Sequence, residues 1–281
     1  KTDTGTTVLH LATNELESTI DLLVAKGADV NARRAKDGRT PLLCSINYYN
    51  DKTMLALIKH GADCNVQDDQ GVSALQIALE NHSPSLVQVK ALLANGADPN
   101  CRNKKGETAL HVMRSWERQG DLLASLLAAN ADLEARTSDG LSVLLRAVLN
   151  NSSHADIKCL IAAAARIDAR DFDGRTILHY CCEKDNCVDL LRILIDLGAD
   201  PSSRDFAGNT LFHQVARQQP SYHEKAQLEL LTTLLELDVS PTSLNNYGQT
   251  PFHIAAGMRR SCGRPNSYKT DPFEFLLGPK C

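Results

Sequence analysis

A short motif returns eight times along the chain and sets its period. A glycine followed two residues later by Thr or Ser begins each copy, and successive glycines are separated by 33, 33, 35, 34, 34, 34 and 40 residues. The eight glycines are Gly5, Gly38, Gly71, Gly106, Gly140, Gly174, Gly208 and Gly248. A period of about 20 to 50 residues is typical of repeat architectures, in which a unit buries its apolar face only against its neighbours. We therefore expect a stack of small, similar units.

Each copy carries the same signals for two helices and a connecting loop. The Thr or Ser suits a helix N-cap, and in two copies proline follows it, as in Thr40-Pro41, at the helical position that tolerates a missing N–H group. A Leu-Leu pair comes roughly 12 to 20 residues later, and Gly-Ala-Asp often follows it, as in Gly27-Ala28-Asp29. Glycine ends a helix well because it adopts positive φ without strain. The order helix, helix, hairpin-like loop is predicted for each copy.

These motifs resemble the ankyrin repeat along essentially the whole chain. The resemblance implies an all-α solenoid of antiparallel helix pairs with short hairpin loops, folded as a single continuous domain. About eight repeats are predicted, at approximately 2–34, 35–67, 68–102, 103–136, 137–170, 171–204, 205–244 and 245–281, the last incomplete. Because neither end resembles a polar capping repeat, we expect the natural protein to continue beyond both ends, or at least beyond Cys281.

Three repeats depart from the pattern. In repeat five Ala164-Ala165 stands where other copies have Gly-Ala, so this is where we expect the stack to fray or divide. The insertion around residues 218–224 in repeat seven is predicted to lengthen a loop or add a turn to a helix. In repeat eight a polar loop is predicted over 259–270, with the second helix at 272–277.

The composition argues against several classes of function. The net charge is -4, so no overall positive field exists to hold a nucleic acid or an anionic membrane. The basic residues Arg259, Arg260 and Arg264 are expected to lie on a solvated loop. No apolar run reaches the roughly 18 residues that span a bilayer, so no direct membrane insertion is expected. Phosphate-binding, zinc-protease and serine-hydrolase motifs are absent, and neither enzymatic activity nor a cofactor is predicted.

The histidines and cysteines have a structural interpretation. Five histidines share one repeat position, three residues after the capping Thr: His10, His111, His179, His213 and His253. The resemblance implies that they bond to that Thr and to the neighbouring loop, and no metal site is predicted. Cys181 and Cys182 stand where the family has small core residues, with a redox or metal role as the alternative. The nine cysteines favour a reducing compartment, either cytoplasm or nucleus.

Asn31 matches a modification signal. Leu23 lies eight residues before it and Asp29 two before it, which resembles the ankyrin-repeat substrate pattern of an asparaginyl hydroxylase. The favoured alternative is that the Asn31 amide only bonds across the hairpin loop.

The resemblance implies that the hairpin tips and the exposed end of the first helix line a concave groove, where residues are free to vary. Aromatic residues gather at these free positions, although rings are only 5% of the chain. Large aromatics and arginine dominate interface hot spots. The predicted groove residues are Tyr48, Trp116, Phe172, Arg175, Phe206 and Tyr247. The alternative is that some of these rings tuck against an adjacent loop.

The predicted function is a non-enzymatic interaction module or scaffold that binds a partner protein or peptide through this groove. The alternative is a recognition or regulatory segment of a larger protein whose effector domain, such as a channel, a transferase or a signalling ATPase, lies outside these residues. The fragment itself is expected to be a monomer.

Overall fold

The computed structural model describes residues 5–12, 17–46, 51–81, 84–114, 116, 119–184, 187–218 and 224–261. Their regular secondary structure is helical, and the one β feature among them is an isolated bridge between Gln67 and Ser73. The helices are α1 (Val8–Leu11), α2 (Glu17–Ala25), α3 (Pro41–Ile46), α4 (Asp51–Lys59), α5 (Ala74–Glu80), α6 (Leu86–Ala94), α7 (Ala109–Val112), α8 (Gly120–Ala128), α9 (Val143–Leu149), α10 (His154–Ala162), α11 (Ile177–Cys181), α12 (Val188–Asp196), α13 (Leu211–Ala216), α14 (Glu224–Glu236) and α15 (Pro251–Ser261).

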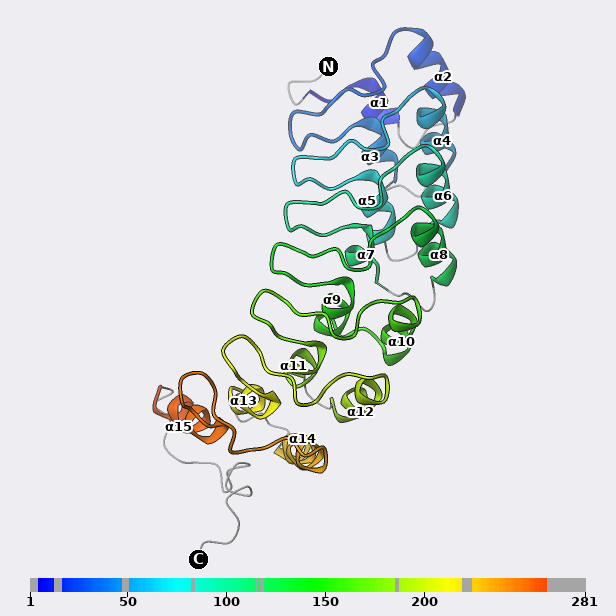
Figure 1. Ribbon diagram of the computed structural model, residues 1–281. Helices are drawn as coiled ribbons and strands as arrows, with labels where there is room; N and C mark the ends of the chain where they lie inside the picture. Colours follow the sequence, from blue (N-terminus) through cyan, green and yellow to red (C-terminus); the bar gives the residue numbers. More distant parts are fainter. Residues whose placement is uncertain are drawn as a thin grey trace, which may run out of the picture. The chain divides into compact units, whose positions relative to one another are not determined.

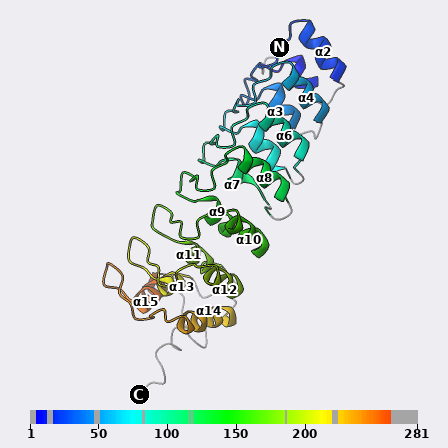
Figure 2. The ribbon, with the colours of Figure 1, turned by 45° about the vertical axis from the view of Figure 1, so that its right-hand side comes forward.

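The helices alternate between two kinds. We call the odd-numbered helices inner and the even-numbered helices outer. Figures 1 and 2 show the inner helices of a unit following one another in one row and the outer helices in a second row. An inner helix packs against the outer helix of its own repeat and the inner helix of the next, as α3 does with α4 and α5. The hairpin loops project from the inner helices on the side away from the outer row (Figure 1). This is the predicted all-α solenoid arrangement.

The chain divides into two compact units. The first unit comprises Lys1–Asp139 with Lys158–Ala164, and the second comprises Gly140–Ile157 with Ala165–Cys281. The division runs through predicted repeat five. A single continuous domain with the eight predicted repeat boundaries therefore stays a prediction, and the two units are described separately below.

Leucine-rich inner helices form the core of each unit. Leu42, Leu75 and Leu110 are buried in the first unit, and Leu178 and Leu211 are buried in the second. Each of these leucines lies one or two residues after the capping Thr or Ser of its helix. The repeated motif therefore places an apolar side chain in the core of every one of these repeats. Burying a leucine in this way contributes about 1.5 to 3 kcal/mol.

Most of the inner helices begin at a reciprocal N-terminal cap. In α11 the backbone N–H of Thr176 donates to His179 Nδ1 at 3.2 Å, while Thr176 Oγ1 lies 3.0 Å from the same nitrogen. His179 Nε2 then donates to the carbonyl of Asn209 in the next repeat at 3.3 Å. The same Thr–His pairing recurs at His10, His111, His213 and His253. The predicted bond to the capping Thr is confirmed for all five histidines, and the predicted bond to the neighbouring loop is confirmed for His10, His179 and His213.

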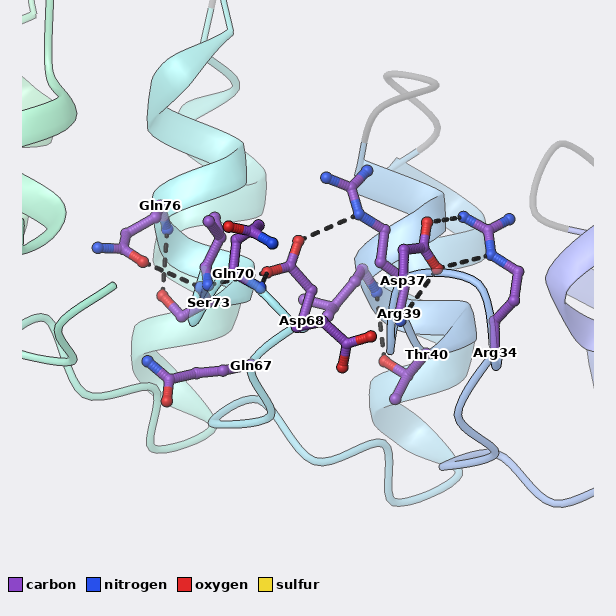
Figure 3. Close-up of polar contacts among 12 residues, drawn as sticks. Arg34, Asp37, Arg39, Thr40, Gln67, Asp68, Gln70, Ser73 and Gln76 are labelled. Carbon is purple, nitrogen blue, oxygen red and sulfur yellow. Dashed lines mark hydrogen bonds and ion pairs between the residues drawn. The ribbon is translucent and has the colours of Figure 1, made fainter. Parts of the chain in front are cut away.

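Repeat three makes the same cap with different residues. Ser73 N–H donates to Gln76 Oε1 at 2.9 Å, and Gln76 N–H donates back to Ser73 Oγ, as Figure 3 shows. Gln76 Nε2 reaches the carbonyl of Glu107 in the next repeat at 2.6 Å. The side-chain amide of glutamine thus reproduces both bonds of the histidine ring.

Outer helices end at a residue in the left-handed conformation. Glycine occupies this place at Gly27, Gly61, Gly96 and Gly198. In repeat five Ala164 takes it with φ 72°. A residue with a Cβ pays about 1 to 2 kcal/mol in this conformation, so the weak helix end predicted for repeat five carries backbone strain.

The last two repeats differ from the pattern as follows. Outer helix α14 has 13 residues where α12 has 9, so the insertion in repeat seven lengthens a helix. Inner helix α15 continues to Ser261 and includes Arg259 and Arg260. The prediction that these arginines lie on a loop is wrong, because the helical run begun at Pro251 does not stop after two turns. The second helix predicted at 272–277 and Arg264 lie outside the described residues.

Candidate protein-interaction surface

A buried Asp or Asn shapes the hairpin turn in repeats three, six, seven and eight. In repeat six, Asp171 Oδ1 accepts the backbone N–H groups of Asp173 at 2.9 Å and Arg175 at 2.8 Å. Asp68 does the same in repeat three and also pairs with Arg39, as Figure 3 shows. These bonds close the turn from its inside, so the two residues before the repeated glycine are held outward. We call these two residues the hairpin tip.

Neighbouring tips are joined through their backbones. In the first unit Asp69 N–H donates to the Asp37 carbonyl at 2.9 Å, and Lys104 N–H donates to the Gln70 carbonyl at 3.0 Å. In the second unit Phe206 N–H donates to the Asp173 carbonyl at 2.8 Å. Within each unit the tips therefore form a continuous edge with a fixed register.

Two phenylalanines stand on this edge in the second unit. The Phe172 and Phe206 side chains are 62% and 67% exposed. Each ring lies over the glycine of the preceding hairpin: a Cβ added to Gly140 would come 2.6 Å from Phe172 Cγ, and one added to Gly174 would come 2.4 Å from Phe206 Cδ1. The glycine backbone thus covers one part of each phenylalanine ring and fixes the orientation of the ring. Most of the ring surface is exposed to solvent.

Tyr247 belongs to the next tip and is 74% exposed. In that repeat Asn246 occupies the position over the preceding glycine that phenylalanine occupies in the two preceding repeats. Its side-chain nitrogen donates to the Phe206 carbonyl at 3.0 Å, and its Oδ1 lies over Gly208. Phe172, Phe206 and Tyr247 therefore have the exposure predicted for groove residues.

The prediction that Trp116 is exposed is wrong. Its side chain is only 2% exposed and forms part of the core, as does Met113. The prediction counted ten residues after Gly106 and assumed that the helix reached that far. Inner helix α7 ends at Val112, and Met113 is extended, with φ -60° and ψ 142°. Trp116 thus comes after the chain has left the helix, and its ring fills the interior.

Arg175 lies at the centre of a polar cluster in repeat six. Its Nε donates to Asp171 Oδ2 at 2.9 Å, and its terminal nitrogens pair with Asp173 and Glu183, each at 3.4 Å. The guanidinium also stacks 4.8 Å above the Tyr180 ring. Arg175 is therefore held in one place by its neighbours, three residues after Phe172 in the sequence.

Two members of this cluster were not singled out from the sequence. Tyr180 is buried, and its hydroxyl donates to Asp171 Oδ2 at 2.6 Å. Gln214 lies in α13 of the next repeat, and its Nε2 donates to Glu183 Oε1 at 2.6 Å. The sequence signal that could have identified Tyr180 and Gln214 is that each is a side chain with a polar group inside a largely apolar inner helix. Burial raises the pKa of the Glu183 carboxyl.

The Asn31 amide bridges two hairpin loops. Its Nδ2 donates to the Gly61 carbonyl at 3.1 Å, and its Oδ1 accepts the Asp63 N–H at 2.9 Å. Asn65 and Asn100 make the same pair of bonds to their following repeats. The favoured structural role of Asn31 is thus observed, and its hydroxylation stays a prediction. Tyr48 lies outside the described residues.

The described cysteines are free thiols, and Cys181 and Cys182 are fully buried. The Cys181 thiol donates to the Cys187 carbonyl at 3.5 Å, and this neighbour together with burial raises the pKa of the Cys181 thiol. Both residues pack as small core side chains. Within the described ranges, no three His, Cys, Asp or Glu residues are grouped to hold a metal ion. None of the described helices is long and apolar enough to cross a membrane.

Comparisons with known proteins agree with this architecture. The crystal structure of the ankyrin repeat domain of Bcl-3, a unique member of the IkappaB protein family, is similar with a TM-score of 0.67 and 28% identity. That likeness covers 82% of this chain and 100% of the other. Mouse Rabankyrin-5 is 33% identical over 95 residues, which are 30% of this chain and 8% of Rabankyrin-5.

Two further relatives match over similar stretches. The mouse B-cell lymphoma 3 protein homolog is 37% identical over 75 residues, 26% of this chain and 17% of the relative. The Arabidopsis thaliana ADP-ribosylation factor GTPase-activating protein AGD4 is 39% identical over 77 residues, 27% of this chain and 10% of the relative. The chain thus matches less than a fifth of the length of each of these relatives. A family model described as ankyrin repeats matches residues 9–89 and 112–205. The chain belongs to the ankyrin-repeat family.

Proposed function

We propose that this protein-interaction module binds an extended segment of a partner protein along the hairpin tips of the second unit and the groove that the family forms beside them. The observation that carries the proposal is the pair of exposed rings of Phe172 and Phe206, each oriented by the glycine beneath it. The core does not need rings at these positions. A ring that is held in place loses little conformational entropy when a partner covers it, which favours binding.

The other predicted groove residues have different parts in this proposal. Tyr247 extends the aromatic edge by one repeat, and Arg175, three residues after Phe172 in the sequence, supplies a charge that its neighbours hold in place. Trp116 is left out because it is buried. Tyr48 stays in the proposal on its sequence position alone. No catalytic step is assigned, and the module acts by binding only, without a cofactor or a nucleic acid.

The test is affinity capture with the whole chain, followed by measurement of the captured partner's Kd. We expect Phe172→Ala and Phe206→Ala each to weaken binding about 30-fold, the size of a hot-spot residue at about 2 kcal/mol. Leu22→Ala is the matched control, because Leu22 is 59% exposed on outer helix α2 of the first unit. Equal affinities for all three variants would overturn the proposal. Thermal melting of each variant excludes loss of folding as the cause.

The second candidate function is that of a recognition or regulatory segment within a longer protein that carries a channel, transferase or signalling ATPase domain. It is favoured by the relatives' lengths, since this chain matches only 8% of Rabankyrin-5 and 10% of AGD4. The complete coding sequence tests it. An open reading frame that ends within a few residues of both termini would exclude it.

The same proposal places the protein in the cytoplasm or nucleus as a monomer. The neighbouring free thiols of Cys181, Cys182 and Cys187 favour a reducing compartment. Light scattering after gel filtration tests the monomer, and mass spectrometry without reductant tests the thiols. A native disulfide at Cys181 or Cys182 would contradict the assignment of compartment.

A further inference from the structure

The two exposed phenylalanine rings of the second unit repeat with the period of the stack. Phe172 and Phe206 both lie two residues before the repeated glycine of their hairpin, and each ring lies over the glycine of the preceding hairpin. The inner helices of the two repeats, α11 and α13, pack against each other, and packed helices have axes about 8 to 10 Å apart. Because the rings occupy equivalent positions in the two repeats, they are separated by about the same distance.

The backbone groups along this edge are already bonded. Phe206 N–H donates to the Asp173 carbonyl at 2.8 Å, and Asn246 N–H donates to the Ala207 carbonyl at 2.9 Å. The Phe206 carbonyl accepts the Asn246 side-chain nitrogen at 3.0 Å. A partner that added a β-strand here would need free N–H and C=O groups. These bonds therefore favour a partner segment that is held through its side chains, on the rings.

The ring separation can be compared with three conformations of a partner segment. A polyproline II helix returns to the same face every three residues, about 9 Å along its axis. A β-strand returns every two residues, about 7 Å along the strand. An α-helix returns after two turns, about 10.5 Å, but it presents a continuous apolar stripe to the surface that binds it. The polyproline II period lies within the range of the ring separation.

The surface between the rings is polar. Asp173 lies between them along the edge, because it follows Phe172 and its carbonyl binds Phe206 N–H, and its side chain is 76% exposed. An α-helix that spanned both rings would place the apolar residues of its middle turn against this carboxylate, and removing the charge from water is costly. A polyproline II helix presents only one residue in three to the surface. The polar surface thus also favours a polyproline II segment.

We infer that the partner segment is rich in proline and adopts the polyproline II conformation, with one proline on Phe172 and another, three residues away, on Phe206. The inference rests on the proposed function, since it names the chemistry of the partner at the same surface. Proline restricts the segment before it binds, so little conformational entropy is lost, and aromatic surfaces bind such segments through their apolar faces. In repeat eight Asn246 stands in place of the phenylalanine, so a third proline is not required.

The test is a selection of random 12-residue peptides displayed on phage, with the whole chain as bait, followed by fluorescence-anisotropy titration of the selected peptides. We expect the selected sequences to be enriched in two prolines three residues apart. Insertion of one Ala between these prolines should weaken a peptide about tenfold, because the second proline then misses its ring. Phe172→Ala and Phe206→Ala should weaken it at least as much. Leu22→Ala, on exposed outer helix α2 of the first unit, should leave its affinity unchanged.

A double-mutant cycle assigns each proline to its ring. When the proline that contacts Phe206 is replaced by Ala, Phe206→Ala should have no further effect on affinity, while Phe172→Ala should still weaken binding. Asn246→Phe adds a ring at the third equivalent position. This variant should bind a peptide with a third proline, three residues further on, about tenfold more tightly than the wild type does. Loss of folding cannot produce such a gain.

The outcomes separate this inference from the proposed function. Additive losses in the cycle would overturn the inference, as would selected peptides without proline whose apolar residues are two or seven positions apart. If those peptides still lose affinity in Phe172→Ala and Phe206→Ala, the proposed function stands. If the selected peptides bind independently of both rings, the proposed function fails as well.

Discussion

In several of the inner helices one side chain makes two bonds, one to its own cap and one to the next repeat. His179 accepts the N–H of its capping Thr176 through Nδ1 and donates to the Asn209 carbonyl of the next repeat through Nε2. The ring must be neutral for this, since a protonated Nδ1 could not accept. Burial lowers the pKa of His179 and of His213 for the same reason. Gln76 makes equivalent bonds and does not titrate.

This equivalence predicts a pH effect. The unfolded chain takes up protons below about pH 6.5, while the folded His179 and His213 resist protonation because their pKa is lowered. Stability is therefore complete above pH 7 and is lost as the pH falls from the unfolded pKa toward the lower folded one. His179→Gln with His213→Gln should melt like the wild type at pH 7.5 and at a higher temperature than the wild type at pH 5.5.

Calorimetric melts of both proteins at the two pH values check this prediction. Parallel pH profiles for the wild type and the glutamine variant would show that these rings do not titrate differently in the folded and unfolded states.

Trp116 is predicted to act on stability alone. Its burial means that Trp116→Ala removes a large side chain from the core, a change that costs about 3 to 5 kcal/mol. Phe206→Ala, on an exposed tip, should change the free energy of unfolding by about 0.5 kcal/mol or less. Urea denaturation of the two variants gives both numbers. A Trp116→Ala protein as stable as the wild type would contradict the position of this ring in the core.

At the scale of the element, the glycines of a repeat fall into two kinds, one in the hairpin and one at the end of the outer helix. Gly174 has φ +77°, and an added Cβ would meet the Phe206 ring at 2.4 Å. Gly198, at the end of α12, has φ +101° and would meet nothing within 4 Å. Gly174 leaves room for the aromatic ring of Phe206, whereas Gly198 only allows the backbone to adopt the left-handed conformation.

Alanine substitutions separate these two functions. Gly198→Ala should cost about 1 to 2 kcal/mol, the strain of a left-handed residue alone. Gly174→Ala should cost clearly more, because it also displaces Phe206, and adding Phe206→Ala should remove the excess. Urea denaturation of the single and double variants measures the coupling. Equal costs for the two glycine variants would show that Phe206 does not rest on Gly174.

Much of the element order could be predicted from the sequence, because the glycines, capping residues and leucines act locally and repeat. The Thr–His cap was expected from the resemblance, because Thr176 and His179 occupy the positions that the family uses for it. The exposure of Phe172 and Phe206 was expected from the resemblance, because the two residues before the repeated glycine lie at the hairpin tip in the family. The burial of Trp116 was not expected, because it depends on where α7 stops, and that depends on packing around the chain after Val112. The partnership of Gln214 with Glu183 joins two repeats, and no signal within one repeat reveals it.

At the scale of the whole molecule, the division into two compact units passes through predicted repeat five. That repeat ends α10 with Ala164 at φ 72° and has no histidine in its cap. In a repeat protein, stability is approximately the sum of repeat terms and neighbour terms, so a strained repeat lowers protection locally.

Hydrogen exchange should show this weakness. Amides of 139–170 are expected to exchange faster than those of predicted repeats two and three, and Ala164→Gly should slow them by relieving the left-handed strain. Ala163→Gly is the matched control, because it removes the same methyl group from a residue outside the left-handed region. Equal protection of the amides from exchange across these repeats in the wild type would contradict this prediction.

The central claim is that the partner lies on the tips of Phe172 and Phe206, and site-specific photocrosslinking tests it most directly. The photoreactive amino acid p-benzoylphenylalanine is placed in separate proteins at positions 172, 206 and 22, the last on exposed outer helix α2. We predict that positions 172 and 206 crosslink the captured partner within one short segment, that excess unmodified chain competes both crosslinks away, and that position 22 gives none. Crosslinking at position 22 with none at 172 and 206 would contradict the account.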